Sequence, residues 1–380
     1  MLTRQGWATL VASAGSFVVG RFLGVIELYV IGSALVALIA LAFIAVNRRL
    51  PELEVSRAAR PSTVAVGERS RVDIEVQNCS RRRSPRLALW EPVGDTGGAE
   101  MQLAPLAGGD SVTAAYRIPT MRRGRVGIGP ARLQRSDLLG LCRRTTRLGG
   151  SDEVLVVPER VPLAFPGLAS TGRLGEHIRM RAMGRTGFEF HSQREYVPGD
   201  DLRRINWKTS ARVGDLIVRE TTPEGVHRCL VVLDTDPRRY DHDGFERAVS
   251  AAASVVTGAV AAGAITRLVA PGLDLRGPDV AHETLRRLAT LVPSTAGLDH
   301  ALAGGAHADG LGLVVVVTST VASHAAAAAS TVAGPDEVMV LITTMAPARG
   351  GTRFVAGATS LVDLEEEWNR LVSGQDGPSL

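Results

Sequence analysis

The sequence of 380 residues is poor in cysteine, poor in aromatic residues and almost without net charge. Its three cysteines, Cys79, Cys142 and Cys229, lie far apart and have neither zinc-site nor disulfide-framework spacing. They are expected to stay reduced, as in a cytosolic compartment. Aromatic residues make up only 4% of the chain, so we expect cores built from Val, Leu and Ala. A net charge of +4 is too small to indicate a nucleic-acid-binding protein.

The motifs of common enzyme classes are also missing. The chain has no Gly-x-x-x-x-Gly-Lys-Ser/Thr phosphate loop, no Gly-x-Ser-x-Gly nucleophile elbow and no His-Glu-x-x-His zinc motif. Its eight histidines are scattered. A hydrolase hidden at the end of a strand is the less favoured alternative, because it needs a nucleophile with an adjacent base that the sequence does not identify. We therefore expect a non-enzymatic protein without a cofactor.

Long hydrophobic runs are confined to the N-terminal residues 1–50. The run Leu28–Val46 contains no charged residue and is long enough to cross a hydrocarbon core of about 30 Å. The run Trp7–Val25 reaches the same length if Arg21 extends its charged end to the interface. Glu27 then lies near the tip of a tight turn. The pattern predicts a transmembrane helical hairpin; a secretory signal peptide is the alternative, but no convincing cleavage site follows.

Basic residues flank both predicted membrane helices. Arg4 precedes the first, and Arg48 and Arg49 follow the second. By the positive-inside rule both ends are cytoplasmic, which predicts a multi-pass protein of the inner (plasma) membrane with a cytoplasmic body. The Asn78-Cys79-Ser80 sequence points the other way, because it matches a glycosylation acceptor of exported proteins. Such a three-residue pattern often arises by chance, so we give it no weight.

Residues 51–158 have the period-two pattern of β-strands. Polar and β-branched residues alternate over Arg71–Val76 and Val112–Ile118, and glycine-rich turns separate such runs. No long helical pattern interrupts them. This spacing predicts a small all-β sandwich of immunoglobulin-like size.

Residues 159–380 begin with a charged segment and then alternate between strand and helix patterns. The alternation predicts an α/β domain with a doubly wound sheet, whose ligands gather at the carboxyl ends of the strands. The predicted strands are Leu230–Leu233, Ile265–Val269, Leu313–Val317 and Glu337–Thr343, and the predicted helices are Phe245–Ala262, Val280–Leu291 and Leu361–Val372.

The segment from Gly187 to Arg219 is the most diagnostic part of the chain. It resembles the signature of the bacterial domain of unknown function 58 family, whose C-terminal half is similar to a von Willebrand factor type A domain. The matching residues are Gly187, Glu189, Phe190, Arg194, Tyr196, Gly199, Asp200, Arg203, Ile205, Trp207, Ala211 and Arg212. The resemblance implies a type A-like fold for the domain that follows.

The type A resemblance also implies a place for a metal. Metal-binding type A domains carry Asp-x-Ser-x-Ser after the first strand, and the matching positions here are Asp234, Asp236 and Arg238. Arg238 puts a cation where a ligand oxygen belongs. Thr318 follows the later strand where a metal-binding version often has Asp. We therefore expect Asp234 and Asp236 to form a degenerate site without Mg²⁺, with Asp234 capping a turn or pairing with Arg238; a magnesium-dependent adhesion module is the alternative.

Two interpretations of the charged segment remain open. Its acidic and basic residues either form an internal ion-pair network with Trp207 in the core, which is slightly favoured, or a partner-binding face anchored by aromatic residues. The candidate residues for either role are Arg194, Tyr196, Asp200, Arg203, Trp207 and Arg212.

The family resemblance implies a partner as well. Members resemble partners of MoxR-type AAA+ ATPases, which act in protein maturation or remodelling. The chain is therefore expected to be a membrane-anchored cytoplasmic adaptor that docks such an ATPase or its client.

Overall fold

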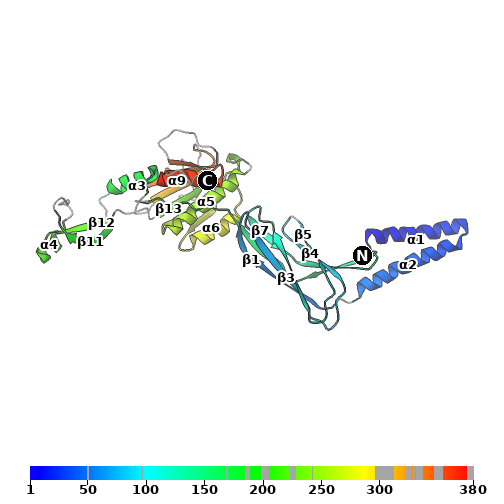
Figure 1. Cartoon of the computed structure of the whole chain (residues 1–380). Helices are drawn as coiled ribbons and strands as arrows, with labels where there is room; N and C mark the ends of the chain where they lie inside the picture. Colours follow the sequence, from blue (N-terminus) through cyan, green and yellow to red (C-terminus); the bar gives the residue numbers. More distant parts are fainter. Residues whose placement is uncertain are drawn as a thin grey trace. The chain divides into compact units, whose positions relative to one another are not determined.

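The computed structural model describes the chain in two compact units, Met1–Val157 and Pro158–Leu380 (Figure 1). The described residues are all except 49–50, 96, 168–169, 185–188, 198–204, 223–227, 242, 296–311, 322–326, 328–329, 331–336, 346–353 and 375–380. For some residues within helices and strands, among them 189–194 and 219–222, the backbone alone is described.

The N-terminal unit begins with the two helices that the sequence predicts. Helix α1 spans Arg4–Leu23 and helix α2 spans Ile26–Asn47. Gly24 ends α1 at a positive φ of 71°, a conformation that glycine adopts without strain, and this permits the tight turn. Both helices are long and apolar enough to cross a membrane. Their lengths correspond to about 30 Å or slightly more at 1.5 Å per residue.

Small residues bring α1 and α2 together. Ser13 and Gly20 lie seven positions apart in α1 and are buried, and a Cβ atom at Gly20 would lie 3.1 Å from Leu28 of α2. The Ser13 hydroxyl donates a hydrogen bond to the carbonyl oxygen of Gly32 in α2, at 2.8 Å. A Cβ atom at Gly32 would lie 3.0 Å from the ring of Phe17, so the close approach requires a residue without one. Packing through small residues is typical of helices within membranes.

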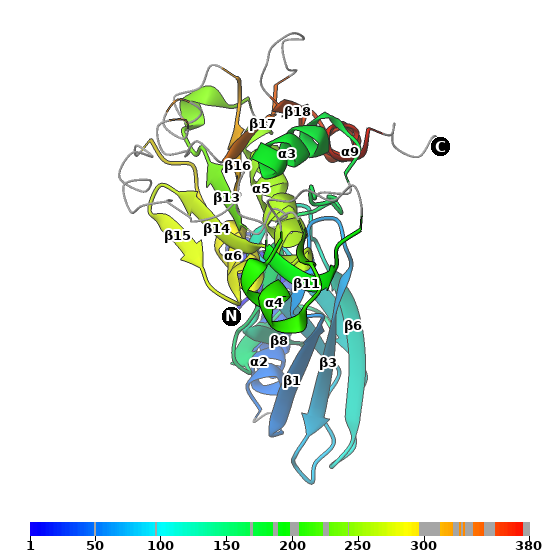
Figure 2. The ribbon, with the colours of Figure 1, turned by 90° about the vertical axis from the view of Figure 1, so that its left-hand side faces the viewer.

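Ten strands follow, in the region where the period-two pattern predicts them. They form three sheets, with orders β1-β3-β6, β2-β10-β7 and β5-β4-β8-β9. Figure 2 shows β1, β3 and β6 side by side. The strands are β1 (Leu53–Arg60), β2 (Thr63–Ala65), β3 (Ser70–Asn78), β4 (Leu87–Pro92), β5 (Gly98–Leu103), β6 (Ser111–Ile118), β7 (Gly124–Ile128), β8 (Ala131–Ser136), β9 (Arg143–Leu148) and β10 (Asp152–Val157). Strand β3 shows the expected alternation, with Val72, Ile74 and Val76 buried.

An ion pair is buried between these strands. The Nε of Arg57 on β1 donates to Glu91 on β4, and their side chains are 3% and 0% exposed. Tyr116 on β6 donates its hydroxyl to the other oxygen of Glu91, at 2.8 Å. Burial and this carboxylate raise the pKa of Tyr116, so its hydroxyl remains a donor. The Nη1 of Arg57 also donates to the carbonyl of Gly150, at 2.6 Å. The network joins elements that the sequence separates widely.

The Asn78 side chain is not available as a glycosylation acceptor. It is buried and donates hydrogen bonds to the carbonyl oxygens of Arg82, Leu106 and Ala107, at 2.8, 3.2 and 3.1 Å. In the folded unit this side-chain amide is therefore not accessible.

The C-terminal unit is organised around a six-stranded sheet with the order β15-β14-β13-β16-β17-β18 (Figure 2). All neighbouring pairs are parallel except β14 with β15. Every residue of β16 is buried, as in a central strand covered on both faces. The strands are β13 (Arg228–Leu233), β14 (Ile265–Ala270), β15 (Leu273–Arg276), β16 (Gly312–Thr318), β17 (Val338–Thr343) and β18 (Phe354–Gly357).

Helices cover this sheet where the sequence predicts them. Helix α5 (Gly244–Ala261) packs an alanine-rich face on β13, β14 and β16. Helix α6 (Val280–Ala289) lies beside it, and α9 (Leu361–Ser373) buries Trp368, whose indole N–H donates to the carbonyl of Ala164 at 2.6 Å. Helix α3 (Arg173–Gly184) packs on α9. The glutamates of α9 are not all turned to solvent, because Glu367 accepts a hydrogen bond from the backbone of Gly357.

The diagnostic segment forms a small structure of its own. Strands β11 (Glu189–Glu195) and β12 (Ile217–Thr222) pair as an antiparallel hairpin. Between them lies the short helix α4 (Trp207–Val213), which Asn206 caps at its start and Gly214 ends at a φ of 88°. The prediction located this segment as distinct but did not identify its hairpin.

Candidate functional site

The candidate site in the six-stranded sheet lies where the strand order changes direction. Strands β13 and β16 are neighbours, although β14 and β15 follow β13 along the chain and lie on its other side. In such parallel sheets the crevice at the carboxyl ends of these two central strands is the usual ligand site. Asp234 follows β13 directly, and Thr318 ends β16. The topology therefore brings together two residues that are 84 positions apart.

Asp234 is buried and its oxygens have partners. Thr318 donates its hydroxyl to Oδ2 at 3.0 Å, and the backbone N–H of Asp236 donates to Oδ1 at 3.1 Å. The second bond is the turn cap that the sequence predicts for Asp234. Tyr240 donates its hydroxyl to the carbonyl oxygen of Asp234 at 2.7 Å, and burial raises the pKa of that tyrosine.

The predicted pairing of Arg238 with Asp234 is wrong. Arg238 instead forms a two-bond ion pair with Asp236, with its Nε at 2.9 Å from Oδ1 and its Nη2 at 2.8 Å from Oδ2. These hydrogen bonds lower the pKa of Asp236. Arg239 contributes a second cation, with its Nε at 3.3 Å from Asp236 and 3.9 Å from Asp234. The reason is local: a 3-10 turn over Pro237–Arg239 folds Arg238 back onto the residue two positions before it.

Buried hydroxyl groups continue this edge of the sheet. Thr343 ends β17 directly opposite Thr318, and the backbone N–H of Thr344 donates to the Thr318 carbonyl at 3.1 Å. Among the described residues, neither Thr343 nor Thr344 has a hydrogen-bond partner for its buried hydroxyl. Unpaired buried donors are costly and uncommon, so these two hydroxyls are an unusual feature of this edge of the sheet.

The described residues do not fit a divalent cation. Of the two carboxylates at this edge, Asp236 is occupied by Arg238, and Arg239 lies within 4 Å of both. The other oxygens nearby are hydroxyls, which are weak ligands for Mg²⁺ without carboxylates. No cluster of three or more acidic, histidine or cysteine side chains that would suit a metal occurs in the described part of the chain. The donor set therefore differs from that of a magnesium site.

Helix α4 in the diagnostic segment is fixed by one face only. The backbone N–H of Asn206 donates to the carbonyl of Ile217 on β12 at 2.8 Å. The hydroxyl of Ser210 accepts from the Ile217 N–H at 2.8 Å, and both Ile205 and Ser210 are buried. Ala211 lies four residues after Trp207, and Arg212 lies four residues after Lys208. Residues four positions apart lie on the same side of a helix, so the members of each pair are neighbours. These four side chains are exposed.

Trp207 is the clearest correction to the sequence analysis. The prediction that it lies in the core is wrong, because its side chain is 64% exposed. The apolar residues near Trp207 suggested a buried turn, but only one side of this segment is buried. Ile205 and Ser210 pack toward β12, and Trp207 lies on the other side of the helix. Val197, Val213 and Leu216 of the same segment are also exposed large hydrophobic residues. Exposed apolar residues close together are a common feature of interaction surfaces.

The remaining signature residues divide into two groups. Tyr196 is partly exposed, and its backbone N–H donates to the carbonyl of Leu216 at 2.7 Å. Arg212 is exposed on α4. Asp200 and Arg203 lie outside the described residues, and for Arg194 the structure describes only the backbone, in β11 opposite Val218.

Some residues of the sheet edge were not predicted. Arg239 and Tyr240 contact Asp234 or its backbone, and Thr344 extends the row of hydroxyls. The tandem arginines and the Thr343-Thr344 pair after a predicted strand were the available signals. Only the strand order shows that they converge.

Comparison with known proteins assigns the C-terminal half to a family. Residues 192–377 match the family described as "Protein of unknown function DUF58". The uncharacterized protein YeaD of Bacillus subtilis (strain 168) is 26% identical over 170 residues, which cover 43% of this chain and 40% of YeaD. The chain thus matches about two fifths of the length of this curated relative.

Two solved structures are similar to smaller parts of the chain. One is the CARDB domain of a Pyrococcus furiosus protein, crystallised with di-metal ions. The match covers 29% of this chain and 90% of the CARDB chain, with 15% identity and a TM-score of 0.23. The other is the putative ApaA protein of Bordetella pertussis. The match covers 29% of this chain and 98% of the ApaA chain, with 13% identity and a TM-score of 0.21. Scores this low do not establish a common fold. The match over residues 192–377 and the similarity to YeaD confirm the predicted resemblance to the DUF58 family for the C-terminal half of the chain.

Proposed function

We propose that this protein is a membrane-anchored adaptor that binds another protein through its DUF58 half. In this proposal α1 and α2 cross the plasma membrane. The β-sheets of the first unit and the whole second unit lie in the cytoplasm, and the exposed face of α4 docks the partner. The partner that the family resemblance implies is a MoxR-type AAA+ ATPase acting in protein maturation or remodelling. No catalytic step is assigned to the chain.

Charge at one end of the helix pair supports this orientation. Arg4 begins α1 and Arg48 follows α2, so both lie at the end that meets the β-sheets. Arg135 donates to the carbonyl of Arg48 at 3.2 Å, and Arg144 donates to the carbonyl of Asn47 at 3.3 Å. The sandwich therefore adds arginines to the end that the positive-inside rule assigns to the cytoplasm.

The topology of the two units supports the finer fold assignments. Numbered from β13, the six-stranded sheet has the order 3-2-1-4-5-6 with an antiparallel edge strand, as expected for a doubly wound, type A-like domain. The strands of the first unit are antiparallel except for β2 with β10, as expected for an immunoglobulin-like sandwich. Type A-like domains without a metal would serve as binding modules, which agrees with the arginines on Asp236.

The exposed Trp207 is the observation that carries the docking proposal. An exposed tryptophan costs solvation free energy, and tryptophan and arginine are both enriched at binding hot spots. Lys208 and Arg212 lie next to the Trp207–Ala211 side of α4, so the partner surface should be apolar at its centre and acidic at its rim.

Replacing Trp207 with alanine should weaken partner binding by about 2 kcal/mol or more, a factor of about thirty. The measurement is affinity capture of the full-length protein from membranes, with ATP and without nucleotide, followed by quantification of the captured AAA+ ATPase. Val362→Ala is the matched control, because Val362 is equally exposed but lies on α9. Recovery of no ATPase by the unaltered protein in either condition would remove the proposed partner, and equal capture by Trp207→Ala would remove the proposed surface.

Cys79 reports the orientation of the body, because it is exposed whereas Cys142 and Cys229 are buried. A membrane-impermeant maleimide should leave Cys79 unmodified in intact cells and modify it after permeabilisation. Desolvation and the carboxylate of Glu54, 3.7 Å from the sulfur, raise the pKa of Cys79, so little thiolate is present at pH 7. Glu54→Gln should therefore speed the reaction in permeabilised cells, and Glu153→Gln, a control on another strand, should not. Modification in intact cells would contradict a cytoplasmic body.

A further inference from the structure

The base of the helix pair is joined to the β8–β9 hairpin by backbone hydrogen bonds. The N–H of Thr3 donates to the carbonyl of Leu141 at 2.9 Å, and the N–H of Arg143 donates to the carbonyl of Met1 at 2.9 Å. Gly6 permits this approach, because a Cβ atom there would overlap the Leu141 carbonyl. The pairing holds the start of α1 beside β9 and leaves a groove between them.

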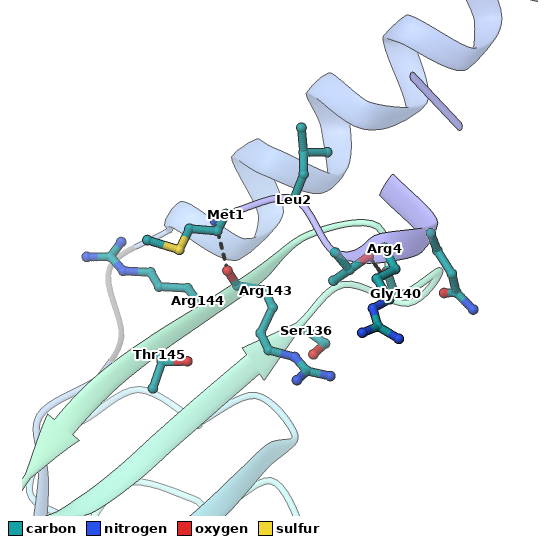
Figure 3. A pocket seen from close by; sticks show the side chains of 10 residues that line it. Met1, Leu2, Arg4, Ser136, Gly140, Arg143, Arg144 and Thr145 are labelled. Carbon is teal, nitrogen blue, oxygen red and sulfur yellow. Dashed lines mark hydrogen bonds between the residues drawn. The ribbon is translucent and has the colours of Figure 1, made fainter. Parts of the chain in front are cut away.

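This groove is cationic. It has a volume of about 730 Å³, and none of its ten lining residues is acidic (Figure 3). Figure 3 shows the side chains of Arg4, Arg143 and Ser136 directed to one side of the β8–β9 hairpin and Arg144 to the other. Among the described residues, neither Arg4 nor Arg143 forms a salt bridge. Two guanidinium groups with a serine hydroxyl form the donor set that binds a phosphate group.

The nearest acidic side chain on this hairpin is occupied. Asp137 accepts hydrogen bonds from the backbone N–H groups of Cys142 and Leu139, at 2.6 and 2.9 Å. Burial raises the pKa of Asp137, but these backbone donors outweigh it and the net pKa is lowered. Asp137 therefore stabilises the loop, and among the described residues it forms no salt bridge with Arg4 or Arg143. The nearby Arg135 has a pKa lowered by burial and by Arg48 and Arg144, which indicates positive charges crowded together.

A second groove continues from the first along the two helices. Its volume is about 450 Å³, and it shares Met1 and Leu2 with the cationic groove. Every side chain that lines the second groove is apolar or a cysteine. Besides Met1 and Leu2, the lining residues are Leu10, Val36, Ile39, Ala40, Phe43 and Cys142. A channel of this kind between helices α1 and α2 suits a hydrocarbon chain.

The depth of the two grooves agrees with the water–lipid boundary. Both helices are long and apolar enough to cross a membrane, and Arg4 and Arg48 lie at the helix ends that meet the sandwich. Leu138 and Leu139, in the turn between β8 and β9, are large apolar residues with 105% and 57% exposure. At the end of a membrane helix these leucines would enter the bilayer surface, with the arginines at the level of the lipid headgroups.

We propose that these two grooves bind one anionic phospholipid, with its phosphate on Arg4, Arg143 and Ser136 and one acyl chain between α1 and α2. This site rests on the proposed membrane insertion. The lipid neutralises a group of arginines that lacks acidic partners, and it fills the apolar channel beside them. It thereby fixes the helix pair against the sandwich in membranes that contain acidic lipids.

The test measures lipid retention by the full-length protein in detergent, using native mass spectrometry with equal amounts of phosphatidylglycerol and phosphatidylcholine. The unaltered protein should retain phosphatidylglycerol preferentially. The double variant Arg4→Gln, Arg143→Gln should lose about fivefold of this preference for each arginine, about 25-fold in all. The control Arg117→Gln, Arg122→Gln removes the same charge from exposed arginines and should keep the preference. Arg117 lies at one end of the β1-β3-β6 sheet, and Leu53, which follows the membrane helices, lies at the other.

Two further measurements separate the explanations. Ala40→Phe fills the apolar channel and should reduce retention of phosphatidylglycerol, whereas glycerol phosphate, which has no acyl chain, should not compete for the site. Equal retention of both lipids by the unaltered protein, a loss of preference in the control, or full competition by glycerol phosphate would overturn the proposal. Extraction of the protein by alkaline carbonate would refute the membrane anchor; retention in the membrane together with equal lipid binding would refute the lipid site alone.

Discussion

Replacing Glu91 with alanine should lower the free energy of unfolding of the N-terminal unit by about 3–5 kcal/mol. Glu91 and Arg57 are almost completely buried, and the change leaves the Arg57 guanidinium without its closest carboxylate. Asp152 does not replace it, because it contacts a different nitrogen of Arg57 at 3.4 Å and its side chain is largely exposed. Tyr116 also loses the acceptor of its hydroxyl. The effect is large because an uncompensated buried charge is costly.

Two companion variants distinguish the ion pair from loss of packing. Tyr116→Phe removes a single hydrogen bond to Glu91 and should cost about 1.5–3 kcal/mol at most. The double change Arg57→Met, Glu91→Leu removes both charges and should destabilise the unit less than Glu91→Ala. Hydrogen exchange of backbone amides in β1, β3 and β4 of the full-length protein measures each change. If the double variant were as unstable as Glu91→Ala, the buried charge would not be the cause.

Trp368→Ala should lower the free energy of unfolding of the C-terminal unit by about 3–5 kcal/mol. Trp368 of α9 is 1% exposed and lies in the main core of this unit, where its indole N–H donates to the carbonyl oxygen of Ala164. The change creates a cavity and leaves the Ala164 carbonyl without the indole donor. Urea-induced unfolding, followed through hydrogen exchange of α5 and β13, measures the loss.

The same change at Trp207 is the matched comparison. Because Trp207 is exposed, Trp207→Ala should change the stability by less than about 0.5 kcal/mol. The two tryptophans of the DUF58 half should therefore separate stability from binding: Trp368→Ala unfolds the unit, and Trp207→Ala leaves it folded but impairs docking. A loss of several kcal/mol at Trp207 would mean that it supports the fold and would contradict its proposed use as a contact residue.

The sequence predicts the elements of both units well wherever the pattern is long. The helices α1, α2, α5, α6 and α9 and the strands β13, β14, β16 and β17 lie within a few residues of their predicted ranges. In each of them the burial of one face or of the whole element sets the order of apolar residues, so the pattern can be read locally. Short edge strands such as β15, with alternating and partly exposed residues, lack this signal and were not predicted.

The candidate site is harder than these elements to predict from the sequence, for a different reason. Asp234 and Thr318 were each identified, but their contact depends on which strands are neighbours. The partner of Arg238 depends on the turn at Pro237, and the exposure of Trp207 depends on which side of α4 faces β12. These are properties of the folded arrangement, and residue types alone do not contain them.

The backbone pairing at Leu141 has a practical consequence for work on this protein. Residues 1–3 complete the border of the β8–β9 hairpin, and α2 covers Leu141 and Cys142 through Ala42 and Val46. A shortened chain that starts at β1 would keep all ten strands of this unit but would leave that border unpaired and its apolar cluster in water. The two helices thus belong to the folding unit of the sandwich, and soluble fragments are better designed from Pro158 onward, where the second compact unit begins.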